Sequence, residues 1–263
     1  MISLNQGFIA ATFAYTTIRA IPAHCFTLPT YNLPFSSRQK FTSSTAILES
    51  ANEKNVLFDT PGWQSIKKDL DQVPVFACAN AEGQPMKYRI DLAKKTGEEE
   101  SVFDVPLFYT HVDDALAELK KARESADIPG MDINPYPLGE IFQMWATDKA
   151  VIIPNKNAIL QAGAPPNSNP MGQNVPLFAC MEIAQENEDG KPVLPLFMEL
   201  EDANAAVKEA VSYDGGKEEE FEVVCLSLPG AIEMLANADE KSTAFHFIPP
   251  STSLKHIRDY LSN

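Results

Sequence analysis

The chain has 263 residues, of which 44% are hydrophobic, and this is enough for one large domain or two small ones with buried cores. Its formal net charge of −15 is the reverse of the basic surface that nucleic-acid-binding proteins need, so we expect no nucleic-acid partner. The 4 cysteines are too few for a disulfide scaffold, and no apolar run approaches the roughly 20 residues of a membrane-spanning helix.

The first 48 residues differ from the rest of the chain because they contain three basic residues and no acidic residue. A mildly apolar stretch has the length of a signal-peptide core, and small residues near its end place a predicted cleavage between Cys25 and Phe26. The residues that follow are rich in hydroxyl side chains, as transit peptides are. We interpret 1–25 as a signal peptide and 26–48 as a transit-like segment, which together form a bipartite presequence (1–48). An ordinary disordered N-terminus is the alternative.

The rest of the chain contains the same three blocks of sequence twice, in the same order. Residues 73–78 (VPVFAC) recur as 175–180 (VPLFAC), with five of six positions identical. In the second block, the sequence match aligns Phe108 with Phe197, and the loop that follows is one residue shorter in the second copy. The three blocks begin at residues 73, 105 and 138 in the first copy and at 175, 194 and 228 in the second.

Hydrophobic periodicity and turn residues predict the elements of each copy. In chain order, we expect a helix over 63–70, strands over 73–78, 86–90 and 105–109, a helix after Asp114, a strand over 131–136, a helix over 138–145 and a strand over 150–153. The second copy predicts a strand over 175–180, a shorter hairpin, a strand beginning at Leu194, a helix after Asp202, a strand over 221–226, a helix over 228–235, a strand over 244–248 and a terminal helix.

Two of these expectations are specific enough to be tested by the strand pairing and by the helix starts of the structure. The strand over 86–90 is predicted to return along 73–78 as a hairpin, because Asn80 and Gly83 form a turn signal between them. Asp114 and Asp202 are predicted to precede their helices and to cap the free N–H groups of the first turn.

We therefore predict an α+β fold made of two pseudo-symmetric repeats of mixed sheet flanked by helices, which share a core or pack closely. The first repeat is expected over 73–160 and the second over 175–262. A leading segment (49–72) precedes them, and a linker rich in Pro, Gly and Asn (161–174) joins them.

No catalytic, cofactor-binding or metal-binding motif is present, so we predict that the protein is not an enzyme and needs no cofactor or metal. Cys78 and Cys180 occupy matching places in apolar strands, which favours buried, inert thiols. A thiol-dependent enzyme that uses Cys78, Cys180 or Cys225 is the catalytic alternative.

The sequence has a surplus of large apolar residues at matched positions of the two copies. Most of them will form the core. If some are exposed, each half carries an apolar groove, and Met-rich grooves accept varied sequences. The candidate groove residues are Phe76, Phe108, Met144, Trp145, Phe178, Phe197 and Met234.

The order V-P-[VL]-F-A-C, P-L-F, D-A-x-A and then F-H-F-I-P-P, over about residues 60–262, resembles the Tic 22-kDa family of the chloroplast inner-envelope translocon. The strongest single matching stretch is 245–250, followed by a C-terminal helix. The resemblance implies a pseudo-symmetric fold with apolar pockets and no enzymatic activity. It also implies a chaperone-like part in passing unfolded precursor proteins between envelope translocon subunits. The acidic stretches 96–100 and 215–220 depart from the family pattern.

With the presequence, the resemblance predicts a plastid protein-import factor of an alga with a complex red-type plastid. We expect it to reach the intermembrane space of the inner envelope pair through the secretory route, without an integral membrane span, although a peripheral membrane association and the stroma stay open. A plastid scaffold protein that binds no clients is the non-enzymatic alternative.

Overall fold

The computed structural model describes residues 57–91, 102–125, 129–186, 192–214, 217–236 and 244–261. The predicted presequence (1–48) and its cleavage site lie outside these residues.

The first sheet has the strand order β2-β3-β1-β4, and β5 pairs in parallel with β3. The other pairs in this sheet are antiparallel. Its strands are β1 (Pro74–Ala79), β2 (Lys87–Asp91), β3 (Val102–Tyr109), β4 (Asp132–Pro137) and β5 (Val151–Ile153).

The second sheet repeats this arrangement, with the order β10-β8-β6-β9 and with β7 paired to β8. Here β10 is parallel to β8, as β5 is to β3, and β6 is antiparallel to both of its neighbours, as β1 is. The fold is therefore α+β with two matching mixed sheets, as predicted. The strands are β6 (Pro176–Cys180), β7 (Gln185–Glu186), β8 (Pro192–Phe197), β9 (Val223–Ser227) and β10 (Ala244–Ile248).

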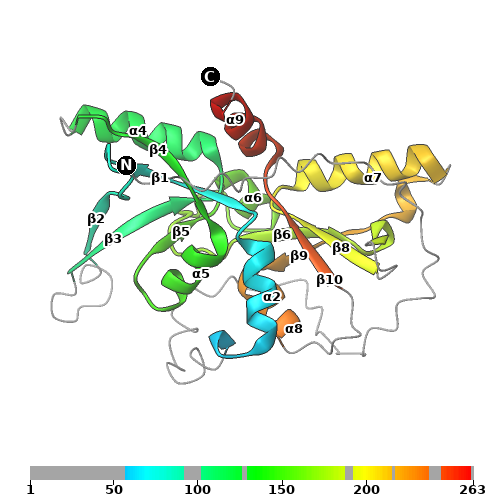
Figure 1. Cartoon of the computed structure of the whole chain (residues 1–263). Coiled ribbons are helices and arrows are strands. Elements are labelled where there is room, and N and C mark those ends of the chain that lie inside the picture. Colours follow the sequence, from blue (N-terminus) through cyan, green and yellow to red (C-terminus); the bar gives the residue numbers. More distant parts are fainter. Residues whose placement is uncertain are drawn as a thin grey trace.

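Helices cover both sides of the two sheets. Figure 1 shows α4 (Val112–Ser125), α7 (Leu200–Asp214) and α9 (Ser251–Leu261) on one side, and α2 (Pro61–Leu70), α5 (Leu138–Ala146) and α8 (Leu228–Ala236) on the other. The short α6 (Lys156–Gln161) and the 3-10 turns η3 (Met181–Ile183) and η4 (Glu218–Glu220) complete the described helical segments. The predicted helices are confirmed, whereas α6 was not predicted.

The structural register shifts one sequence match by a residue. Phe76 of β1 lies opposite Tyr109, and the equivalent Phe178 of β6 lies opposite Phe197, so the structural counterpart of Phe197 is Tyr109 and not Phe108. The counterpart of Phe108 is Leu196, because Phe108 pairs with Ile152 as Leu196 pairs with Phe247. The alignment of Phe108 with Phe197 is therefore wrong, and the loop gap that it required disappears. A one-residue shift moves a side chain to the other face of a sheet.

The predicted hairpin between β1 and β2 is confirmed only at its turn. Gly83 N donates to Asn80 O at 2.9 Å, Ala79 bridges Pro85, and Met86 N donates to Cys78 O at 2.8 Å. Beyond Met86 the chain leaves β1, and β2 pairs with β3 along its whole length, so the predicted return of 86–90 along 73–78 is wrong. β4 pairs with β1 over its full length on one edge, and β3 pairs with β1 at Phe76 on the other.

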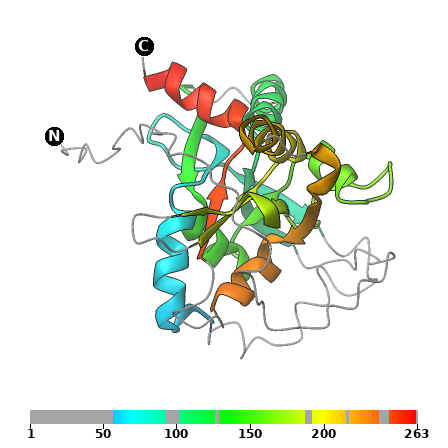
Figure 2. The same cartoon turned by 90° about the vertical axis from the view of Figure 1, so that its right-hand side faces the viewer.

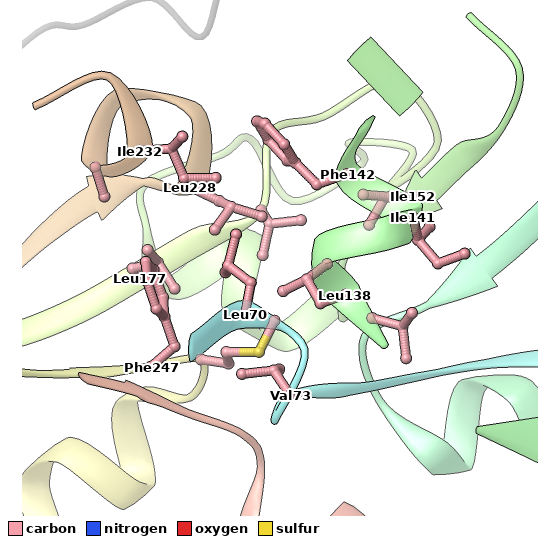
Figure 3. Close-up of a cluster of buried hydrophobic side chains, with 14 of the residues drawn as sticks. Leu70, Val73, Leu138, Ile141, Phe142, Ile152, Leu177, Leu228, Ile232 and Phe247 are labelled. Carbon is pink, nitrogen blue, oxygen red and sulfur yellow. The ribbon is translucent and has the colours of Figure 1, made fainter. Parts of the chain in front are cut away.

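The buried hydrophobic residues form a central cluster and two outer clusters. The central cluster lies between the inner faces of both sheets and the helices α2, α5 and α8, and Figure 3 shows Leu70, Leu138, Leu177 and Ile232 meeting there from four different elements. The two halves therefore share a core, as predicted. The first outer cluster lies under α4 and the second under α7.

Each half completes the outer cluster of the other half. Ala158 of α6, which follows the first sheet, is buried in the second outer cluster beside Ala203 of α7. Ile257 of α9, which follows the second sheet, packs on the first outer cluster, and the ring of His256 lies 6.2 Å from that of Phe76. The helices that end the two halves are thus exchanged. The division into repeats at 73–160 and 175–262 stays a prediction, but neither range contains all the residues that cover its own sheet.

Candidate functional site

Four of the seven predicted groove residues are buried in the core. Phe76, Phe108 and Phe178 are at most 2% exposed and Phe197 is 8% exposed. They are distributed over all three clusters, with Phe108 in the central cluster, Phe76 in the first outer cluster and the other two in the second. They cannot line a groove in either half, because both faces of their strands are covered by helices. For these four positions the groove prediction is corrected to a structural role.

The other three groove residues lie on two neighbouring helices. Met144 and Trp145 of α5 are half-buried against the central cluster, and Met234 of α8 is 48% exposed. α5 and α8 meet at a small depression of 10 Å³, the volume that holds about one water molecule. The molecule therefore presents apolar side chains here without a preformed groove. The lining residues are Phe142, Trp145, Ile152, Gln173, Val175, Leu228 and Pro229.

A larger, polar pocket of 380 Å³ lies where α4, α6, α7 and α9 begin or end, and the sequence did not predict it. Its lining comes from both halves: His111 and Asn155 belong to the first, and Glu199 and Thr252 to the second. His111 and Glu199 are equivalent positions in the corrected register, since each stands two residues after the paired Tyr109 or Phe197. His111 Nε2 lies 3.2 Å from Glu199 Oε1, so two pseudo-symmetric counterparts contact each other.

The hydrogen bonds of His111 define its tautomer. The backbone N–H of Asp113 donates to Nδ1 at 3.2 Å, so the neutral ring carries its proton on Nε2. Nε2 then donates to Thr252 Oγ1 at 2.8 Å and faces Glu199. The ring therefore caps the start of α4 with one nitrogen and joins α9 and the start of α7 to it with the other. Equal spacing from Asp114 and Asp202, three residues in each case, is the sequence signal that could have matched His111 with Glu199.

The prediction that Asp114 and Asp202 precede and cap their helices is wrong. Both lie within the first turn, since α4 begins at Val112 and α7 at Leu200. Asn155 Nδ2 donates to Asp114 Oδ2, and the backbone N–H of Ser251 donates to Asp202 Oδ2, each at 2.9 Å. The two carboxylates therefore hold the start of the segment that follows the last strand of each sheet.

Burial raises the pKa of Glu199 above its ordinary value of 4.5, although the nearby His111 opposes the shift. A folded-state pKa above the unfolded one means that the ionised carboxylate costs stability, and that this cost grows as the pH rises through the window above 4.5. We expect Glu199→Gln, which mimics the protonated form, to be more stable than the parent at pH 7.5 and equal to it below pH 4.5. Urea unfolding at a series of pH values measures this. An equal loss of stability at both pH values would contradict it and assign Glu199 a stabilising role.

The cysteines of the described residues are free and lie in different environments. Cys78 belongs to the first outer cluster and Cys180 to the second, and both are buried as predicted. Burial raises the pKa of Cys78, and burial together with a hydrogen bond to Glu182 raises the pKa of Cys180 to about 12. Thiols with raised pKa values are poor nucleophiles, so these two positions do not favour the thiol-enzyme alternative. Cys225 is exposed, on β9.

Within the same ranges, no three or more His, Cys, Asp or Glu side chains are grouped so that they could hold a metal ion. No helix in the described part of the chain is long and apolar enough to cross a membrane.

No family model and no curated protein sequence matches the chain. The chain does match solved structures, and the following two are among them. Tic22 of Anabaena, a protein of protein transport, has a TM-score of 0.57 and 18% sequence identity, over 75% of this chain and 96% of that chain. Tic22 from Plasmodium falciparum has a TM-score of 0.57 and 19% identity, over 75% of this chain and 98% of that one. At this level of identity a match shows the fold and nothing further. The chain therefore has a Tic22-like fold.

Proposed function

We propose that the protein is a plastid protein-import factor, a non-enzymatic adaptor that binds precursor proteins as they cross the envelope. The Tic22-like fold carries this proposal, because the matches extend over nearly the whole length of both Tic22 structures, and the Anabaena protein acts in protein transport. The buried thiols of Cys78 and Cys180 support a role without catalysis. The predicted presequence supports entry into the plastid through the secretory route. The likeness to Tic22 supports a place in the intermembrane space and partners among the envelope translocon subunits.

The surface that we assign to precursors is the one around Trp145 and Met234. These side chains come from the matching helices α5 and α8, and part of each stays accessible. Methionine is unbranched and flexible, so it adapts to different apolar segments. Because the depression between the helices is small, we expect precursors to bind weakly and along the surface rather than inside a deep pocket.

Photo-crosslinking in isolated plastids tests this proposal. With benzoyl-phenylalanine in place of Met234, we expect a crosslink to a precursor arrested halfway through import, and we expect the product to resist protease added outside. The matched control replaces Tyr213, which is 68% exposed at the end of α7, on the other side of the molecule (Figure 1). Equal crosslinking at both positions would indicate random collision. No crosslink at Met234, with the precursor shown to be arrested, would favour the scaffold that binds no clients.

A further inference from the structure

The two sheets end in equivalent edge strands with different chemistry. Within the described residues, β4 pairs with β1 alone and β9 pairs with β6 alone. Their registers match, so Pro135 of β4 corresponds to Cys225 of β9, and Pro137 corresponds to Ser227. β4 reads DINPYP and β9 reads VVCLS, without proline or charge. Proline and charged residues are the usual means by which proteins prevent an edge strand from pairing further. β4 has this protection, whereas β9 lacks it.

Hydrogen bonds at the two ends of the strands fix which backbone groups of β9 point outward. Val175 O accepts from Leu228 N at 2.8 Å, so this carbonyl points toward the side of β6 that carries β9. Leu177 and Ala179 follow with the same orientation, since backbone direction alternates along a strand. Cys225 lies opposite Phe178, between those two positions, and its N–H and C=O therefore point away from β6. Val223 is oriented in the same way.

The same reasoning explains the prolines of β4. Cys78 O accepts from Met86 N at 2.8 Å on the side away from β4, so Phe76 also directs its backbone groups away from β4. Pro135, opposite Phe76, then has its ring nitrogen on the free edge and breaks no hydrogen bond of the sheet. Proline at this position is thus compatible with the fold, and its effect is to remove an outward N–H group. β9 retains that group at Cys225.

The surroundings of β9 indicate the charge of a partner. The strand follows Glu218, Glu219, Glu220 and Glu222, which are all exposed, and Lys217 is the basic residue beside them. Figure 2 shows this orange segment running toward α8. A segment that carries Lys or Arg gains favourable electrostatic energy here. A second copy of the chain, with its own net charge of −15, is repelled.

We propose that β9 accepts an extended polypeptide segment as a further strand of the second sheet, and that this segment contains Lys or Arg and few acidic residues. The proposal rests on the proposed function, since the segment is part of a precursor protein. Main-chain hydrogen bonds to Val223 and Cys225 supply sequence-tolerant affinity, and the glutamates before β9 supply the preference for basic segments. This site is separate from the apolar surface on α5 and α8.

Binding of a labelled peptide to the full chain tests the proposal. The probe is a fluorescein-labelled ten-residue peptide that alternates Val or Thr with Lys, followed by anisotropy at low salt. We expect Cys225→Pro to weaken binding about tenfold, because it removes one outward N–H and makes β9 like β4. Cys225→Ser keeps the N–H and is expected to bind within about twofold of the parent. The same peptide with Glu in place of Lys should bind at least about tenfold more weakly than the Lys peptide.

Two controls keep the result interpretable. Cys225→Pro must retain the parent's circular dichroism and midpoint of thermal unfolding, as Pro135 of β4 leads us to expect. If this variant does not fold, a peptide N-methylated at alternate residues tests the same hydrogen bonds, because it lacks the N–H groups that would donate to β9. Equal binding to the parent and to folded Cys225→Pro would overturn the proposal. So would a change in oligomeric state without a change in peptide binding, since the occupant is then a second copy. Crosslinking at Met234 together with no peptide binding would overturn this site and leave the proposed function standing.

Discussion

Residues 57–174 and 175–263, expressed as two separate polypeptides, should each fail to unfold cooperatively. The first fragment loses α9 from its outer cluster and loses the contribution of Leu177, Ile232 and Phe247 to the central cluster. The second loses Ala158 of α6 from its own outer cluster. Each fragment would expose large apolar surfaces to water, and this exposure costs about 25 cal/mol of free energy per Å². Thermal unfolding followed by near-ultraviolet circular dichroism measures the result.

Mixing the two fragments in equal amounts should restore a cooperative transition whose midpoint rises with concentration, because folding is then coupled to association. The control is a single chain of residues 49–263, which we expect to fold without the preceding segment. A cooperative transition in either fragment alone would show that a half is an independent domain, and that the exchanged helices are dispensable.

Phe108→Asp should abolish the folded state. Phe108 is 1% exposed in the central cluster, and its ring packs edge-on against that of Tyr136 at a centroid distance of 5.3 Å. Truncating a buried phenylalanine costs about 3–5 kcal/mol, and burying a carboxylate without a partner adds to this cost. The sum approaches the total stability of about 5–15 kcal/mol that is typical of a folded protein. We expect no cooperative unfolding transition in urea.

Two variants separate this effect from a general intolerance to substitution. Phe108→Leu places at this position the residue that its structural counterpart Leu196 already provides, so it should fold with a modest loss of stability. Met234→Asp makes the same chemical change on an exposed side chain and should stay within about 0.5 kcal/mol of the parent. A folded Phe108→Asp protein would mean that the position is accessible, and would return it to the candidate groove.

Local patterns in the sequence predicted most elements because each pattern depends on neighbouring residues. Leu138, Ile141, Phe142 and Trp145 follow helical spacing, and α5 is found there. The apolar run that ends at Cys78 predicted a buried strand, and β1 is buried along its whole length. The predicted strand over 73–78 begins within one residue of β1, which starts at Pro74.

Pairing between distant strands was harder to predict from the sequence, because the local pattern of a strand does not identify the strand with which it pairs. The blocks VPLF and LPLF suggested that Phe108 and Phe197 are equivalent, yet β-pairing aligns Tyr109 with Phe197. That shift of one residue decides which cluster each ring enters. The predicted return of 86–90 along 73–78 failed for the same reason: a turn between two strands does not show that another strand occupies the edge.

The candidate site was only partly predictable. Sequence could identify the surplus of apolar residues but not their exposure, which depends on the helices that cover both faces of each sheet. It therefore gave buried Phe76 and exposed Met234 the same candidate role in a groove. The contact between His111 and Glu199 depends on the relation between the two halves, and their equivalence became visible only with the corrected register. That β9 pairs with β6 alone among the described residues depends on strand pairing, which a local pattern does not give.

Because the helices are exchanged, the first half cannot finish folding until the C-terminal helix α9 is available to cover it. α9 packs on the cluster under α4, although the whole second sheet lies between the two helices in the sequence. A chain that leaves a ribosome or a membrane channel amino end first therefore presents its first sheet without its full cover until α9 has also emerged. Premature folding of the first half inside a channel is disfavoured, and release of α9 completes the fold. On the import route proposed above, this order of events would keep the chain unfolded while it crosses each membrane.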